Sequence, residues 1–198
     1  MKQDLRITKT KTNIENKFIE LLKNNSFDDI TIKLLISECK INRSTFYRNY
    51  EDKYDLLYKI IEKQLGQFEK IINPHFIINN SHKSIDFKPY FLPLLDYFEK
   101  NKNELLILNH NKLPINIFHE MFIIYSNYLI HEIVSYYHIT NNQKIKLITY
   151  YCQIITSNIL TAIKWWHLES PETSKKEILS MITITIVNGI YPTLQTLY

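Results

Sequence analysis

Apolar residues recur at helical spacing along most of the chain, and short polar stretches separate one apolar stripe from the next. Such i, i+3, i+4, i+7 stripes are typical of amphipathic α-helices. The three stripes in the first third of the sequence are Ile14, Phe18, Leu21 and Leu22; Ile32, Leu35, Ile36 and Cys39; and Tyr54, Leu57, Ile61, Leu65, Phe68 and Ile72. They predict one helix that begins at Thr12, the first residue of a capping box, a second over 32–39 and a linking helix over 52–72.

The remaining pattern predicts further helices, after a polar loop at residues 73–88. They span about residues 89–101, 102–109 and 115–138. One more starts at Asn141-Asn142 and is broken at Ser170-Pro171, and the last reaches at least Asn188. Pro89 and Pro93 suit the first turn of the earliest one, and Ser174 with Glu177 forms a capping box at the start of the last. The chain has only two glycines, which disfavours a turn-rich β fold. We therefore expect an all-α protein with about nine helices.

A short polar helix is predicted between the second and the linking helix. Thr31 can cap the helix over 32–39, and after the turn at residues 40–42 Asn42 can cap the next helix with its side-chain oxygen. Ile41, Phe46 and Tyr50 are its apolar anchors, which leaves its arginines, hydroxyls and amide directed outward. Two short helices joined by such a turn are typical of a helix-turn-helix, whose second helix enters the major groove. The alternative is an ordinary solvated helix face.

Residues 31–58 resemble the N-terminal domain of the TetR family of bacterial transcription regulators. The resemblance lies in Phe27 and Thr31, in the run Asn42-Arg43-Ser44-Thr45-Phe46-Tyr47, and in Tyr50, Lys53 and Leu56-Leu57. It covers about the first 60 residues; beyond them only length and helical layout match. Lys40 and Ser44 stand where the family often has Gly. We therefore expect a strained backbone conformation at Lys40. Which DNA bases the protein prefers stays open.

The resemblance and the residue types together give a set of expected DNA contacts. Arginine, amide and hydroxyl groups suit phosphate oxygens and base edges, and Lys53, in the first turn of the linking helix, suits a phosphate. The expected contacts are Thr31, Lys33, Asn42, Arg43, Ser44, Thr45, Tyr47, Arg48, Asn49 and Lys53. Residues 1–9 are basic and are expected to be a loose arm that lies along the DNA, or else a disordered terminus.

Charge, cysteine content and hydropathy fit this interpretation. Residues 1–53 hold eleven Lys/Arg against eight Asp/Glu, so most of the net charge of +4 lies in the predicted DNA-binding part. Cys39 and Cys152 are expected to be buried free thiols, which fits a reducing compartment. The start of the sequence does not resemble a signal peptide and no long apolar run occurs, so we expect a cytoplasmic protein with no membrane partner.

Residues 1–53 are thus the expected helix-turn-helix domain, and residues 54–198 the expected regulatory and dimerisation domain. The last two helices are apolar over more than one stripe, which predicts contact with a partner as well as with the core; the alternative is that they are core helices buried on all sides. The resemblance implies a homodimer through these two helices, on a palindromic operator of double-stranded DNA. It also implies a small-molecule effector pocket among the aromatic residues. The candidates, each of which is otherwise an ordinary core residue, are Phe98, Phe122, Tyr125, Tyr151, Ile155 and Trp166.

Other classes of function receive less support. Seven histidines are present, but neither a His pair four residues apart nor a cysteine cluster suggests a metal site, and no cofactor is expected. Cys152 or His167 would need a catalytic partner, and no nucleophile motif is present, so we expect no enzyme. A protein of the same fold that binds a protein partner, or lacks an effector, stays an alternative to a repressor released by its effector.

Overall fold

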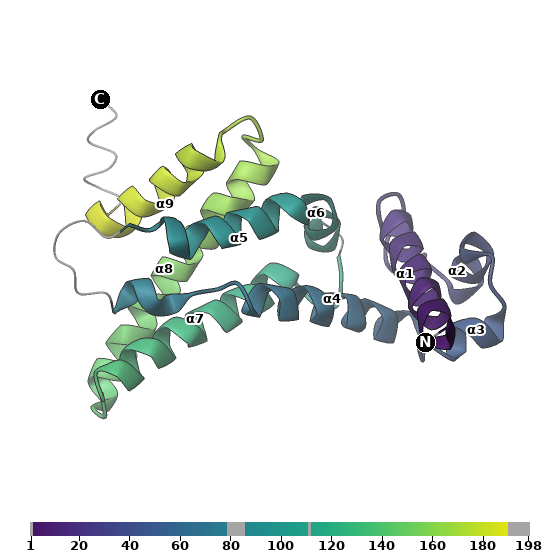
Figure 1. Ribbon diagram of the computed structural model, residues 1–198, viewed down its shortest axis with the longest axis horizontal. Helices are drawn as coiled ribbons and strands as arrows, with labels where there is room; N and C mark the ends of the chain where they lie inside the picture. The colour runs from purple at the N-terminus through teal and green to yellow at the C-terminus, as the bar shows by residue number, and fades with distance from the viewer. Residues whose placement is uncertain (1, 79–85, 111, 190–198) are drawn as a thin grey trace. The chain divides into compact units, whose positions relative to one another are not determined.

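The computed structural model describes residues 2–78, 86–110 and 112–189, with side chains from Thr8 onward except that of His110. Over these residues the chain forms nine α-helices, one short 3₁₀ helix and no β-strand (Figure 1). The prediction of an all-α fold is confirmed. The residues form two compact units, one made of the chain up to Gly66 with Asn103–Ile117, the other of Gln67–Lys102 with the described residues from Phe118 on.

The first unit is built around the apolar face of its N-terminal helix. Its elements are α1 (Lys2–Leu22), α2 (Ile32–Cys39), α3 (Arg43–Tyr47), most of α4 (Lys53–Glu69) and most of α6 (Lys102–His110). Ile14, Phe18 and Leu22 lie four residues apart on α1 and are fully buried. Phe27 packs edge-on against Phe18, with ring centroids 6.3 Å apart. This apolar face holds the short helices in place.

The predicted start of α1 is wrong. The helix begins at Lys2, so the expected loose arm is helical from that residue on, and Met1 lies outside the described residues. Residues 2–11 contain no Gly or Pro and include Lys, Gln, Leu and Arg, which have good helix propensity. A helix anchored by its buried turns extends through such residues because propagation is easier than nucleation. Thr12 therefore lies inside the helix and is not its cap.

Helix α4 begins where Asp52 caps it. Asp52 Oδ1 accepts hydrogen bonds from the backbone N–H groups of Tyr54 and Asp55, both at 2.8 Å. The helix ends at Glu69, three residues before the predicted end, and Ile72 is still buried. Its residues belong to the first unit up to Gly66 and to the second from Gln67 on.

The second unit has an aromatic core. Its elements are the 3₁₀ helix η1 (Pro74–Ile77), α5 (Lys88–Lys100), α7 (Ile117–Tyr136), α8 (Asn142–Leu168) and α9 (Lys175–Asn188). Phe68, at the end of α4, contacts the rings of Tyr97, Phe98 and Tyr125 with centroids 6.1–6.2 Å apart. Helix α9 packs against α8 and against α5.

The predicted helix boundaries in this unit hold to within two residues. Ser174 and Glu177 form the expected capping box of α9. Pro93 lies inside α5 rather than in its first turn, which only Pro89 occupies. Helix α7 ends at Tyr136, and His138 follows with φ 50°, in the left-handed region. Of the predicted loop at 73–88, residues 79–85 lie outside the described residues, as does Pro192.

Candidate nucleic-acid interface

Helix α2 begins at a side-chain cap, as predicted. Thr31 has an extended backbone, and its Oγ1 accepts a hydrogen bond of 3.1 Å from the backbone N–H of Leu34. Leu35 and Cys39 are buried on the inner face, while Lys33 is exposed on the outer one. The helix therefore presents a cation and a capped N-terminal end to the outside.

The turn after α2 is made by a non-glycine residue in the left-handed conformation. Lys40 has φ 53° and ψ 47°, and its backbone N–H reaches back to the carbonyl oxygens of α2. L-residues other than Gly, Asn and Asp seldom adopt this conformation because Cβ crowds the backbone. On the other side, Asn13 Nδ2 of α1 donates to the carbonyl oxygen of Cys39 at 3.1 Å. The turn is thus held to α1.

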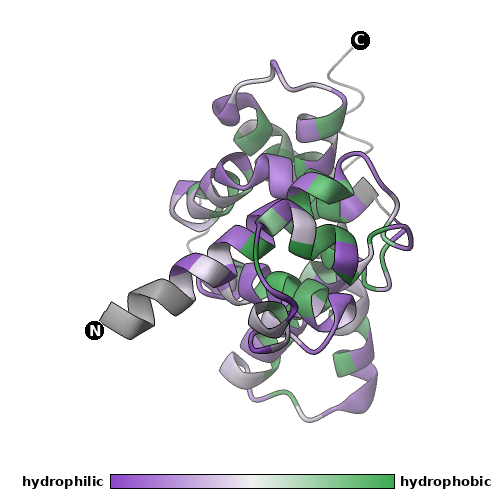
Figure 2. Cartoon of the chain, turned by 90° about the vertical axis from the view of Figure 1, so that its right-hand side faces the viewer, coloured by the Kyte–Doolittle hydropathy of each residue, from purple (hydrophilic) through white to green (hydrophobic). Residues whose placement is uncertain are grey.

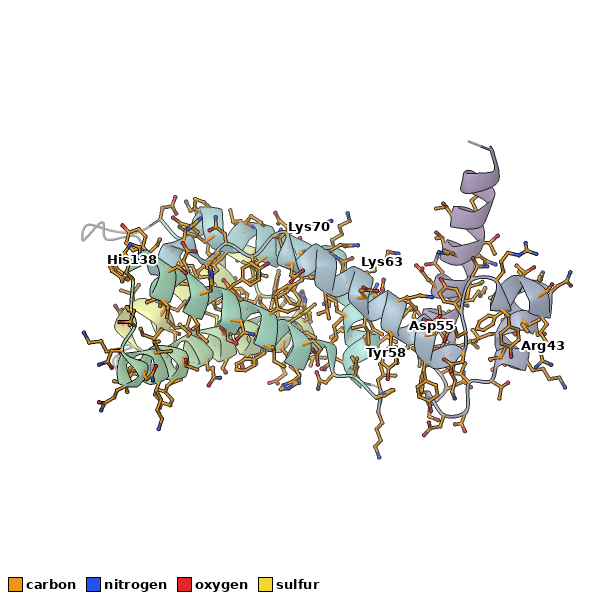
Figure 3. The ribbon with its side chains drawn as sticks, turned by 90° about the horizontal axis from the view of Figure 1, so that it is seen from below. Arg43, Asp55, Tyr58, Lys63, Lys70 and His138 are labelled. Carbon is orange, nitrogen blue, oxygen red and sulfur yellow. The ribbon has the colours of Figure 1, made fainter. Side chains whose placement is uncertain are left out.

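Helix α3 is anchored by two aromatic side chains and leaves its polar side open. Phe46 and Tyr50 are buried, whereas Arg43, Ser44 and Arg48 are exposed. Tyr47 is 44 % exposed, and the guanidinium of Arg43 lies 5.5 Å from the centre of its ring. Figure 3 shows Arg43 directed away from α1 and α4. Arg43 Nη2 also donates to the Tyr47 hydroxyl at 3.5 Å, so the two side chains form one exposed pair that carries hydrogen-bond donors.

The side-chain amides of Asn42 and Asn49 differ in whether they already form a hydrogen bond within the protein. Asn42 is the N-cap of α3 by backbone conformation, but its side chain makes no capping bond, contrary to the prediction. Its amide is exposed. Asn49 Nδ2 donates to the carbonyl oxygen of Thr45 at 2.7 Å, and both residues are half-buried. Asn42 is therefore the better placed of the two amides to contact a partner.

Lys53 is bonded within the protein. Its Nζ donates to the carbonyl oxygens of Phe27, at 2.9 Å, and Asp28, at 3.0 Å. The ammonium also lies 4.7 Å from the centre of the Phe27 ring. Since an ammonium has three N–H donors, one remains for a phosphate. The sequence pattern gave no sign of this bond between the loop before α2 and the start of α4.

The exposed face of this region carries several cations without an acidic partner. Among the described side chains, no carboxylate forms an ion pair with Lys33, Lys40, Arg43 or Arg48. Unpaired cations of this kind attract a polyanion and release its counterions on binding. The geometry therefore fits a surface that contacts phosphates around a short helix.

A carboxylate that the sequence did not single out supports this surface. Glu15 of α1 accepts a hydrogen bond from the hydroxyl of Tyr50 at 3.1 Å and pairs with Lys63 of α4 at 2.8 Å. Burial, and next the charge of Glu15, raise the pKa of Tyr50. Lys59 adds a bond to the carbonyl oxygen of Asn49 at 3.4 Å. These contacts join residues far apart in the sequence, which is why periodicity could not indicate them.

The candidate effector-pocket residues occupy different environments in the second unit. Phe98, Tyr125 and Trp166 are buried, and Phe122 and Ile155 are half-buried. Tyr151 is 60 % exposed, which does not fit the lining of an internal pocket. It neighbours Cys152, which faces the core, and successive helical residues point about 100° apart.

Metal-binding and membrane-spanning features are not found in the described part of the chain. No group of three or more His, Cys, Asp or Glu side chains lies close enough there to hold a metal ion. None of the described helices combines the length and the apolar character needed to cross a membrane.

Comparison with known proteins shows the fold. The structure is similar to the crystal structure of a TetR transcriptional regulator from Streptococcus agalactiae 2603V, with a TM-score of 0.57, 23 % identity and coverage of 94 % of this chain and 98 % of that one. It is also similar to the dihydroxyacetone kinase operon activator DhaS, with a TM-score of 0.56, 18 % identity and coverage of 91 % and 96 %. No family model and no curated protein matches the sequence. The chain has the fold of TetR-type transcription regulators.

Proposed function

We propose that the protein is a sequence-specific DNA-binding transcription regulator that reads duplex DNA with α3. The observation that carries this proposal is the open polar side of α3, with Arg43, Ser44 and Tyr47 exposed above the buried Phe46 and Tyr50. A short helix held from behind and polar in front suits insertion into the major groove, where base edges offer distinct hydrogen-bond patterns. A regulator of this kind acts in the compartment that holds the genome, here the bacterial cytoplasm.

The proposed contacts fall into two groups. Arg43, Ser44, Thr45 and Tyr47 are proposed to contact base edges, because they lie on α3 itself. The residues around α3 are proposed to bind phosphates and so set its register; these are Thr31, Lys33, Asn42, Arg48, Asn49 and Lys53. Phosphate contacts bind all sequences alike, so the four residues on α3 carry the choice of operator.

We propose a homodimer through α8 and α9. Large apolar side chains remain exposed on both helices, although α8 and α9 already pack against each other. They are Leu147, Tyr150, Tyr151 and Ile154 on α8, and Met181, Ile184 and Val187 on α9. A second copy of the same face would cover them in a two-fold interface, and a two-fold dimer fits a palindromic operator with half-sites about 34 Å apart.

The dimer is tested by placing a charge on this face. Val187 is 63 % exposed, so Val187→Asp leaves the core of the protomer intact. We expect this variant to sediment as a monomer at micromolar concentration, while the wild type sediments as a dimer. A second variant, Thr161→Asp, locates the edge of the interface, because Thr161 is exposed on α8: the variant stays a dimer if Thr161 lies outside the interface. Val134→Asp is unsuitable as a control because Val134 is half-buried. A monomeric wild type would contradict the dimer.

We propose that the aromatic core of the second unit binds a small-molecule effector that releases the protein from DNA. Among the described residues, Tyr125 Oη, Thr156 Oγ1 and His167 Nε2 are buried without a hydrogen-bond partner. Buried polar atoms normally have partners, so a ligand with donors and acceptors on an apolar frame would suit these residues. An effector that binds better to the DNA-free state lowers the affinity for DNA by population shift.

The experiment that tests the proposed function is selection of bound genomic fragments. Purified full-length protein is mixed with sheared genomic DNA, and the retained fragments are sequenced. We expect enrichment of a small number of sites that share an inverted repeat. A reporter controlled by such a site should rise when the protein is removed if it represses, and fall if it activates. Recovery of fragments with no shared sequence would contradict the proposal.

A further inference from the structure

Arg43 begins α3 on its exposed side, in a chain whose helices show hydrophobic and hydrophilic residues in alternation (Figure 2). The first turn of α3 contains no acidic residue. A cation at the N-terminal end of a helix is unfavourable, because the partial charge of the backbone there is positive. No carboxylate among the described side chains forms an ion pair with Arg43. Stability of the protein therefore does not explain an arginine at this position.

Tyr47 restrains the side chain of Arg43. The guanidinium lies 5.5 Å from the centre of the Tyr47 ring, and Nη2 donates to the Tyr47 hydroxyl at 3.5 Å. The Tyr47 ring in turn meets the ring of the buried Phe46 edge-on, with centroids 5.6 Å apart. Such contacts reduce the side-chain freedom that would be lost when a partner binds. Arg43 is thus held ready for a group outside the protein.

Arg43 differs from Ser44 and Thr45, two of the other proposed base contacts, in its hydrogen-bond chemistry. A hydroxyl both donates and accepts, so Ser44 and Thr45 fit more than one base. A guanidinium only donates, through five N–H groups. One of these is directed at the Tyr47 hydroxyl, which leaves enough for a contact with two bonds. In the major groove only guanine presents two acceptors side by side, N7 and O6.

The Tyr47 ring adds a second preference beside the guanidinium. The side chain is 44 % exposed, so part of the ring is free to meet a base edge. The methyl group of thymine is the apolar feature of the major groove. Successive bases of one strand lie about 3.4 Å apart along the axis. Two groups 5.5 Å apart can therefore contact neighbouring base pairs.

We propose that each protomer reads a guanine with Arg43 and a thymine of the neighbouring base pair with Tyr47. The inference rests on the proposed function and names the bases that carry the choice of operator. Arg48 follows α3 as its C-cap and is assigned to a phosphate, so it takes no part in this choice. The pair Arg43 and Tyr47 therefore supplies the base preference, and the cations around α3 supply affinity for any duplex.

The test changes single groups of the DNA without changing its base pairing. In the operator recovered from genomic fragments, each guanine is replaced in turn by 7-deazaguanine, which lacks N7, and each thymine by uracil, which lacks the methyl group. Affinity of the full-length wild type should fall about tenfold at one guanine of each half-site, through loss of a hydrogen bond to a charged group. It should fall about fourfold at a neighbouring thymine, through loss of one buried methyl group.

Protein variants assign each effect to its side chain. Arg43→Ala should bind the guanine and 7-deazaguanine duplexes equally. Tyr47→Ala should bind the thymine and uracil duplexes equally, whereas Tyr47→Phe, which keeps the ring, should still distinguish them. Arg48→Ala is the matched control, since Arg48 is also an exposed arginine. It should weaken binding to every duplex alike and keep the tenfold ratio.

Two results separate this inference from the proposed function. An operator that is bound as tightly after replacement of any guanine, or an Arg43→Ala variant that keeps the tenfold ratio as Arg48→Ala does, overturns the base assignment alone. A wild type that binds no duplex overturns the proposed function together with it.

Discussion

The hydroxyl of Tyr50 donates a hydrogen bond of 3.1 Å to Oε1 of Glu15, a residue 35 positions earlier in the chain. The other oxygen of the same carboxylate, Oε2, lies 2.8 Å from Nζ of Lys63. Tyr50 ends the polar segment that contains α3, whereas Glu15 belongs to α1 and Lys63, labelled in Figure 3, to α4. One carboxylate thus connects the recognition segment with two longer helices.

Tyr50→Phe should destabilise the protein while it keeps the ring in place. A hydrogen bond to a charged group contributes about 1.5–3 kcal/mol, and Tyr50 is buried, so water cannot replace it freely. We expect a loss of this size in urea denaturation. Tyr58→Phe is the control, because Tyr58 is 44 % exposed on α4. Equal stabilities of the two variants would mean that the bond to Glu15 contributes nothing.

Lys40→Gly should stabilise the protein. The left-handed conformation at φ 53° costs a residue with a Cβ about 1–2 kcal/mol, and glycine loses about 0.5–1 kcal/mol of that gain through its greater freedom when unfolded. A net gain of roughly 0.5–1 kcal/mol should appear as a higher midpoint in urea. The same exchange at Lys33, a helical residue of α2, should lower the midpoint instead. A lower midpoint for Lys40→Gly would refute the strain.

Lys53→Met should weaken binding to all DNA sequences alike. The variant removes two bonds to the loop carbonyl oxygens and the charge proposed to contact a phosphate. We expect a lower melting temperature together with a salt slope reduced by about one. The salt slope distinguishes a phosphate contact of the Lys53 ammonium from its role in positioning the loop before α2. Only the loss of a phosphate contact changes the number of counterions released on binding. An unchanged slope with weaker binding would assign Lys53 to positioning only.

The second unit should lose stability in mild acid because of His167. Burial, and next the charge of Lys102, lower the pKa of His167 to about 4. In the unfolded chain the imidazole takes up a proton near pH 6.5, so stability is complete above that pH. It falls as the pH drops from about 6.5 to 4, by about 3 kcal/mol over the whole range.

His167→Phe should flatten this acid dependence, as measured by urea denaturation between pH 7 and pH 4.5. The ring stacks on Trp166, with centroids 4.5 Å apart, and phenylalanine can keep that contact. The control is His119→Phe, since His119 is exposed on α7. If wild type and His167→Phe respond to acid in the same way, His167 is not the group that titrates.

Local patterns in the sequence predicted most of the fold. The period of the apolar residues defined α2 to the residue and placed α8 and α9 correctly. Thr31 and Ser174 were recognisable as caps, because a capping bond depends only on residues three positions apart. The buried anchors Phe46 and Tyr50 followed from the same periodicity.

The features that local patterns did not predict depend on contacts between residues far apart in the chain, or on positions where two local signals favour different structures. Glu15 meets Tyr50 and Lys53 meets the carbonyl oxygen of Phe27 only after the chain folds back on itself. The start of α1 was missed because Thr12 suits a cap, yet the preceding residues extend the helix. Tyr151 was placed in a pocket from its residue type alone, which does not specify the side of α8 on which it lies.

The central claim, that the open side of α3 reads bases, is tested most directly by Tyr47→Ala. Affinity is measured for the recovered operator and for a mixed-sequence duplex of equal length. If α3 reads bases, Tyr47→Ala should lose about 1–3 kcal/mol of binding free energy on the operator and none on the mixed sequence. Tyr58→Ala, in which a tyrosine exposed to the same 44 % is removed from α4, should change neither affinity. An equal loss on both duplexes for Tyr47→Ala would contradict base reading by α3.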